Sequence, residues 1–506
     1  MRTGAVERQL RRAKRGAKRL PPREEGVPRM AEEFEGADLG DKRRTKRLQA
    51  IVEAFAAHPD RSLPTIAASS AATEGLYRFI NSKKVELTAA KVLEPHAERS
   101  EERTRRHETV LAIHDGTDIK YRFEGTLREG FGRLGDGQGI QALVSLAVSF
   151  CESSSSMTSN DEHEPLGVVA CQTFTGPRER ARRTKRKPQP KKPPKKGTSR
   201  WGRIAGAEWL SSAVETRRVL GRDADLVHVI DREGDAIELL ARLQQDAERF
   251  VIRVLRKRRV GFGEEDDFKK ITDAATVLPR LFEEHFHVSK RRRAKARQNH
   301  PPREARTARL SYAAGQIRIK KSWELTDDSS IPTFVTLNLV HVKEHEPPEG
   351  EDPIEWFLVT TDPIATEAQV RRIVRIYRAR WLIEEFFRVL KTGCALEKRQ
   401  VESRQALEAI LAISLVVSWR ILLLRHKSRL DARVPASVGF SEIELDLLQK
   451  MRKLPKGATL QEALLKVAET GGHLKQNGAP GNMALVRGLE KLEAQAEVWA
   501  FTMGKM

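Results

Sequence analysis

Three acidic side chains stand where a folded chain can gather groups for chemistry. Asp115 follows the apolar run VLAIH, and Asp231 follows the apolar run LVHVI. Each sits where a predicted buried strand ends, which is where α/β sheets collect their functional groups. Glu384 lies on a long predicted helix farther along the chain. Oxygen ligands on separate rigid elements suit Mg²⁺, and a pair of such ions can serve phosphoryl transfer.

Both aspartates also have an ordinary structural explanation. Asp115 precedes Gly116, so this pair could form a turn at the end of the strand. Asp231 begins the sequence DREGD, in which Glu233 and Asp235 would suit the first turn of a following helix. Position alone therefore favours a structural role for each aspartate taken singly.

The helix that carries Glu384 strengthens the case for chemistry. Four of its polar residues are spaced so that they share one side: Tyr377, Arg380, Glu384 and Lys391. At about 100° per residue they fall on a stripe roughly 60° wide. Apolar side chains are interleaved with them: Trp381, Phe386, Phe387 and Leu390. A solvated face with i,i+4 ion pairs is the alternative, but an otherwise apolar helix indicates that the stripe faces a cleft.

The elements that must position these residues alternate between strands and helices. Strands are predicted over 141–150, 167–174, 226–230, 250–254 and 356–361. Helices are predicted over about 235–245 and 366–391, while 38–106 and 405–506 read as mostly helical. Between 255 and 350 the pattern is that of β-hairpins. The predicted fold class is therefore mixed α/β.

Composition limits the partners. The chain has 506 residues, with 92 Lys+Arg against 70 Asp+Glu, so its formal net charge is +22. Such an excess favours a polyanion, most often nucleic acid. Three separated cysteines exclude a disulfide scaffold, and His114 and His228 lack partners at zinc-ligand spacing. The apolar stretch 409–424 contains Arg420 and is too short for a bilayer, so a buried helix without membrane contact is expected.

The stripe also carries a family resemblance. The segment YRARWLIEEFFRVLKTG resembles the Y-R-E-K signature of bacterial DDE transposases of insertion-sequence family four. The chain is most similar to the transposon-five-like branch, which forms hairpins. The similarity extends to AIHDGTDIKY, VIDREGD, RFVIR and EWFLVTTDP, and it covers most of residues 34–400.

The resemblance implies a role for each matching residue. Asp115, Asp231 and Glu384 would be the catalytic, metal-binding triad of an RNase H-like core that binds Mg²⁺, with Mn²⁺ as a substitute. Residues implied to contact DNA are Tyr377, Arg380, Lys391, Trp356 and Arg253. Trp356 stands where that branch has a tryptophan that stacks in the gap left by a flipped base; without the resemblance, a core tryptophan opening a strand is the expectation.

The N-terminal segments LGDKRRTKRL and AATEGLYRFIN resemble the DNA-binding domain of the same branch. Arg43, Arg44 and Arg47 share a helical face there and would contact phosphates, although a solvated helix surface is the alternative. The expected organisation is a basic arm (1–30), a helical DNA-binding domain (31–106), a catalytic core (107–400) and a helical dimerisation region (401–506). Within the core, a basic loop is expected over 178–196 and a β-rich insertion over about 255–355. The first residue could be Met1 or Met30, and the basic loop is expected to contact DNA non-specifically.

The function implied is that of a cut-and-paste DNA transposase. It would bind double-stranded DNA at transposon ends, cleave it, form a hairpin and transfer the strand to target DNA. A homodimer in the paired-end complex, and a cytoplasmic, nucleoid-associated bacterial protein, are expected. The alternatives are an RNase H-fold nuclease without strand transfer and a catalytically inactive DNA-binding derivative.

Overall fold

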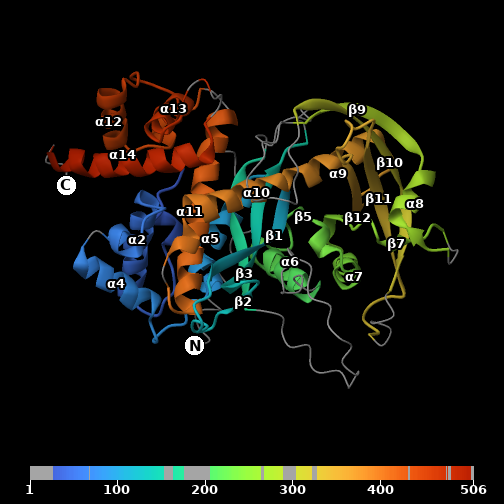
Figure 1. The fold of residues 1–506 in the computed structure, drawn as a ribbon, viewed down its shortest axis with the longest axis horizontal. Helices are drawn as coiled ribbons and strands as arrows, with labels where there is room; N and C mark the ends of the chain where they lie inside the picture. The colour runs from blue at the N-terminus through green and yellow to red at the C-terminus, as the bar shows by residue number, and fades with distance from the viewer. Residues whose placement is uncertain are drawn as a thin grey trace.

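A single large β-sheet forms the centre of the protein, as the computed structural model shows (Figure 1). The structure describes residues 27–502, apart from 68, 153–162, 176–205, 264–266, 289–303, 322–327, 400, 431–432, 475 and 477–479. The sheet order within this part of the chain is β2-β3-β1-β5-β6-β12-β11-β10-β9, and β4 pairs with β3 beside this path. The basic loop 178–196 and nearly all of the arm 1–30 lie outside the described residues.

Six of the ten strands described in this sheet come from the part of the chain that holds the two aspartates. They are β1 (Thr109–Arg122), β2 (Gly132–Leu134), β3 (Gly137–Phe150), β4 (Pro165–Phe174), β5 (Leu226–Ile230) and β6 (Arg249–Arg253). β1 pairs with β3 in the antiparallel sense and with β5 in the parallel sense, and β5 pairs with β6 in parallel. This mixture, with helices on both faces, confirms the predicted mixed α/β class.

The expectation that the strand before Asp115 ends at this residue is wrong. β1 continues to Arg122, and Asp115 pairs with Val144 of β3 while Gly116 pairs with Leu143. The long antiparallel ladder with β3 keeps the backbone extended through the Asp-Gly pair, which a local turn rule cannot foresee. Only the parallel pairing with β5 ends here, at His114 and Ile230.

The predicted β-rich insertion extends the same sheet. β12 (Glu355–Thr360) pairs with β6, and the sheet then continues through β11 (Phe334–His345), β10 (Arg306–Lys320) and β9 (Arg280–Val288). The expected hairpin is therefore present as β10 and β11. The short strands β7 (Arg259–Val260) and β8 (Lys269–Lys270) form a separate pair, followed by α8 (Ile271–Ala274).

The long helix predicted over 366–391 is divided. It consists of α9 (Glu367–Ala379), α10 (Trp381–Arg388) and a π-helical stretch over Val389–Gly393, with Arg380 at the joint between the first two. Thr366 and Gln369 form a capping box that starts α9. On the other face of the sheet lie α6 (Gly206–Leu220) and α7 (Ile237–Gln245).

Helices from both ends of the chain cover the rest of the sheet. The N-terminal ones are α2 (Lys42–Ala57), α3 (Leu63–Ala67), α4 (Ser70–Ile80) and α5 (Ala89–Thr104). The C-terminal ones are α11 (Arg404–Leu430), α12 (Glu442–Arg452), α13 (Leu460–Thr470) and α14 (Asn482–Thr502). They lie beside one another at the end of the molecule opposite β9–β11 (Figure 1). The span 404–429 is long and apolar enough to cross a membrane, but 94% of its apolar stretch is buried inside the protein, as in a core helix.

Candidate active site

The sheet brings the two aspartates to one edge. β1 and β5 run in parallel, and their last paired residues are His114 and Ile230. Asp115 and Asp231 each follow directly, so both occupy the point where this pairing stops. Asp115 is half-buried on a strand that continues, while Asp231 begins the short 3-10 turn Arg232–Gly234. Both acids therefore lie where the pairing between β1 and β5 ends.

Arg380 connects the aspartates to the third acid. Its Nη1 atom lies 3.4 Å from the Asp115 carboxylate and 3.4 Å from the Glu384 carboxylate, and its Nη2 atom also contacts Glu384 at 3.4 Å. Arg380 is buried, with only 8% of the residue exposed. Although burial lowers the pKa of Arg380, the charges of Tyr377, Asp231, Asp115 and Glu384 raise it above its ordinary value. One cation therefore interacts with all three acids.

The two aspartates have opposite pKa shifts. Burial raises the pKa of Asp115 to about 7, and the negative charge of Glu384 adds to the rise, while Arg380 opposes it. Burial also acts to raise the pKa of Asp231, but Arg380, the Arg232 backbone N–H and Arg253 together lower it below its ordinary value. A strongly perturbed carboxyl beside specific charged partners is typical of a functional site.

Tyr377, Arg253 and Trp356 complete the cluster. The Tyr377 hydroxyl donates a hydrogen bond to Asp231 Oδ1 over 3.0 Å, and Arg253 Nη1 lies 3.7 Å from the same oxygen. Burial, with the Asp231 charge, raises the pKa of Tyr377 to about 12, so it donates this bond as a neutral phenol. The half-buried Trp356 ring meets the Tyr377 ring edge to face, with 5.6 Å between centroids. Trp356 therefore lies at the site and only partly in the core.

Lys391 and the N-terminal arginines are not joined to this cluster. Lys391 lies on the π-helical stretch, and within the described part of the chain it makes no hydrogen bond or ion pair with the acids. On α2, Arg43 and Arg47 are exposed, whereas Arg44 donates to the Leu39 carbonyl over 2.9 Å. Arg44 therefore supports the entry to its own helix, and the two exposed arginines are the better candidates for phosphate contact.

Trp381 is a further residue beside the site, and the sequence had placed it among the apolar, buried residues of the helix. It was expected among the apolar residues of the helix, yet it is 47% exposed at the start of α10, next to Arg380. The signal was present in the spacing, because Trp381 is four residues after Tyr377 and three before Glu384 and so lies beside the polar stripe.

A buried hydrogen-bonded chain supports the aspartates from behind. His114 Nε2 lies 2.9 Å from His228 Nδ1, and His114 Nδ1 lies 2.7 Å from Ser145 Oγ. Burial lowers the pKa of both histidines, so the pair is neutral and joins β1 to β5 through hydrogen bonds. These side chains act in packing between the two strands.

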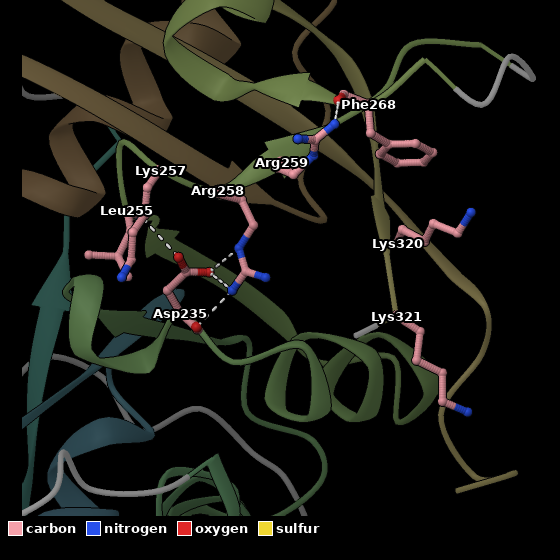
Figure 2. A pocket seen from close by; sticks show the side chains of 8 residues that line it. All are labelled: Asp235, Leu255, Lys257, Arg258, Arg259, Phe268, Lys320 and Lys321. Atoms are coloured by element: carbon pink, nitrogen blue, oxygen red, sulfur yellow. Dashed lines mark hydrogen bonds and ion pairs between the residues drawn. The ribbon is translucent and has the colours of Figure 1, made fainter. Parts of the chain in front are cut away.

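A cavity of about 500 Å³ borders the loop that follows Asp231, as Figure 2 shows. Its lining residues are Asp235, Leu255, Lys257, Arg258, Arg259, Phe268, Lys320 and Lys321. The Asp235 carboxylate points to the Arg258 guanidinium and accepts a bond from its Nε atom over 2.8 Å. This ion pair fixes the loop after β6 against the loop after β5. The described residues that line the cavity do not include the three acids.

The donor set at the cluster fits a hard divalent cation. Three carboxylates on separate elements supply only oxygen, the donor type that Mg²⁺ and Mn²⁺ take. Among the described residues, however, no three His, Cys, Asp or Glu side chains are grouped closely enough to hold a metal ion. The Arg380 guanidinium lies 3.4 Å from the carboxylates of Asp115 and Glu384. By the chemistry of their donor atoms, Asp115, Asp231 and Glu384 are the residues that would hold a metal.

Comparison with known families identifies the class of protein to which such a site belongs. Residues 29–85 match the family described as Transposase DNA-binding, and residues 225–419 match the family described as Transposase DDE domain. The second match includes Asp231 and Glu384 but starts after Asp115, which the sheet pairing brings to them.

The chain thus carries a DNA-binding domain and a DDE domain of transposases, and together they support a DNA transposase of the DDE class. A DDE domain indicates phosphoryl transfer with cleavage of nucleic acid, and such domains generally use divalent metal ions.

Proposed function

We propose that the protein is a cut-and-paste DNA transposase that cleaves transposon ends through a hairpin and inserts them into target DNA. The observation that carries the proposal is the meeting of Asp115, Asp231 and Glu384 around one guanidinium. The mixed order of β3, β1, β5 and β6 supports an RNase H-like core for these acids.

The side chains around the acids suit a DNA strand. Arg380 and Arg253 present guanidinium groups, which match phosphate oxygens in a two-pronged geometry. Tyr377 offers a neutral hydroxyl, and Trp356 offers an aromatic surface beside it on which an unstacked base could lie. These residues would hold and orient the phosphate that reacts.

A divalent cation bound to the three carboxylates, proposed here to be Mg²⁺ with Mn²⁺ as a substitute, would lower the pKa of water and offset phosphoryl charge. All steps are then in-line displacements at phosphorus. In the first, a water oxygen bonds to phosphorus and the 3′ oxygen leaves with a proton. This 3′ hydroxyl attacks a phosphate of the opposite strand, which closes a hairpin while the 3′ oxygen of the flanking DNA leaves with a proton. A second water attacks the same phosphate, which opens the hairpin and frees the 3′ hydroxyl again. The same 3′ hydroxyl then attacks a phosphate of target DNA, and the 3′ oxygen of the target strand leaves with a proton.

Two further parts of the proposal concern assembly. Exposed Arg43 and Arg47 of the DNA-binding domain would contact end DNA, and the helical region 401–506 would join two copies in the paired-end complex. A net charge of +22 supports residence on the bacterial nucleoid in the cytoplasm. Light scattering of the protein with end DNA tests the dimer, since a paired-end complex that contains a single copy of the chain would contradict it.

The decisive experiment is a cleavage and joining assay with the DNA that flanks the reading frame. A duplex of this DNA, labelled at the 3′ end and incubated with Mg²⁺, should give a nick, then a hairpin, then products joined to plasmid DNA. Nicks without joined products would favour a nuclease. Binding without any nick, in either Mg²⁺ or Mn²⁺, would favour an inactive DNA-binding derivative.

A further inference from the structure

Arg380 occupies the centre of the acid cluster in a protein without bound DNA. Its three contacts to Asp115 and Glu384 all measure 3.4 Å. Bonds between a guanidinium and a carboxylate are normally about 2.7–2.9 Å long when geometry is good. The guanidinium therefore neutralises the acids by proximity and is not locked to any one of them.

A metal ion and this guanidinium need the same carboxylate oxygens. A guanidinium carries only donors, so it can face the acids but cannot share them closely with a second cation. With Arg380 absent, however, three carboxylates would repel one another in a half-buried site. Arg380 therefore stabilises the acid cluster while it competes with a metal for it.

A DNA phosphate bound at the site would be an alternative partner for Arg380. Arg253 and the Tyr377 hydroxyl lie within reach of Asp231, so a strand phosphate held there would meet several donors at once. Arg380 lies at the joint between α9 and α10, and its backbone keeps helical angles there (φ −51°, ψ −29°). A change of side-chain rotamer at this joint can move the guanidinium from carboxylate to phosphate without unwinding either helix.

We propose that Arg380 holds the cation position in the DNA-free protein and exchanges it for a DNA phosphate, so that DNA and divalent metal bind cooperatively. This inference rests on the proposed function, because it assumes that a strand phosphate reaches the acids. The exchange of Arg380 from the carboxylates to a DNA phosphate makes the carboxylates available to metal only when substrate is present. By linkage, DNA must raise metal affinity by the same factor as metal raises DNA affinity.

The test measures Mn²⁺ binding to the full-length chain by electron paramagnetic resonance, without DNA. R380Q should bind Mn²⁺ about 10-fold or more tightly than the unmodified protein, within the range of about 5–150-fold typical of coupled sites. R388Q is the matched control, because Arg388 is exposed on the same helix and its loss removes the same charge. Titrations are run at about pH 8.5, because loss of a neighbouring cation raises a carboxyl pKa and lets protons compete.

The second arm adds a duplex of the flanking DNA that is already cut at the end, so that no bond remains to be cleaved. This duplex should tighten Mn²⁺ binding to the unmodified protein and to R388Q, but it should change little in R380Q. Equal Mn²⁺ affinities of R380Q and R388Q, or equal tightening by DNA in both, would overturn the proposal. If circular dichroism shows that R380Q is unfolded, R380M replaces it, since methionine also removes the charge and should also let Mn²⁺ bind more tightly. The DNA-free arm does not depend on transposition, so its failure leaves the proposed function to the cleavage and joining assay.

Discussion

Replacement of Glu33 by glutamine should loosen the attachment of the N-terminal segment to the core. Glu33 is fully buried and contacts His96 Nδ1, and it accepts bonds from Arg103 over 2.9 and 3.1 Å. The Arg103 guanidinium stacks in turn on the Trp419 ring of α11, with 4.4 Å to its centroid. One carboxylate therefore ties the segment before α2 to α5 and to the long core helix.

The stability that this carboxylate contributes can be worked out from the pKa of Glu33. Burial acts to raise the pKa of Glu33, but His96 and Arg103 lower it from 4.5 to about 2. Such a change corresponds to about 3 kcal/mol of stability at neutral pH. Between these two pKa values the unfolded chain binds the proton and the folded chain does not, so this stability is present above pH 4.5 and is lost as the pH falls towards 2. Burial also lowers the pKa of His96, which adds a loss of the same sign below about pH 6.5.

The assay is thermal unfolding followed by circular dichroism between about pH 7 and pH 4, with E33Q beside the unmodified protein. E33Q should unfold several degrees lower at pH 7, and the difference should shrink towards pH 4. E35Q is the matched control, because Glu35 is paired with Arg99 at the surface and should contribute about 1 kcal/mol or less. Equal shifts in E33Q and E35Q, or a difference that stays constant with pH, would refute the reasoning.

Three further outcomes are expected. Replacement of any one of the three site acids by its amide should abolish nicking in a gel assay while end binding stays nearly intact; parallel loss of binding would indicate a structural role. Trp356→Ala should slow hairpin formation about 5- to 100-fold more than the first nick, because stacking on an aromatic contributes about 1–3 kcal/mol per base; a uniform loss in time courses would contradict base stacking. Arg43→Ala or Arg47→Ala should each reduce the salt dependence of DNA binding, in log–log form, by up to about 0.9, whereas Arg44→Ala should lower the melting temperature. Unchanged salt slopes would exclude phosphate contacts by these two arginines.

Local patterns predicted the parts of the fold that depend on nearby residues. The run Leu226–Ile230 is rich in β-branched residues, and it forms β5 at the predicted bounds. The wheel of α9 and α10 placed Tyr377, Arg380 and Glu384 on one side, and their contacts with each other and with the aspartates agree with it. These features follow from periodicity, which is a local property of the chain.

Other features of the fold depend on pairing between residues far apart in the sequence, which local patterns do not reveal. An Asp-Gly pair normally indicates a turn, but fourteen residues of β1 are paired with β3 and hold Asp115 within a strand. The spacing places Trp381 beside the polar stripe, but its exposed fraction also depends on which elements cover the start of α10. The position of Arg380 among the carboxylates was also beyond reach, because it depends on the meeting of β1, β5 and the joint between α9 and α10.

The pairing of β12 with β6 has a consequence for how this chain can be altered. Since Leu358 is paired with Arg253, the hairpin strands share backbone hydrogen bonds with the strand next to the acids. Excision of residues 255–354 would leave β12 beside β6 but remove β11 from its other side, so that the edge of β12 would be open to aggregation. Changes in length should be tolerated at the far loops of β9–β11, whereas trimming from the β6 side should cost solubility before it costs catalysis.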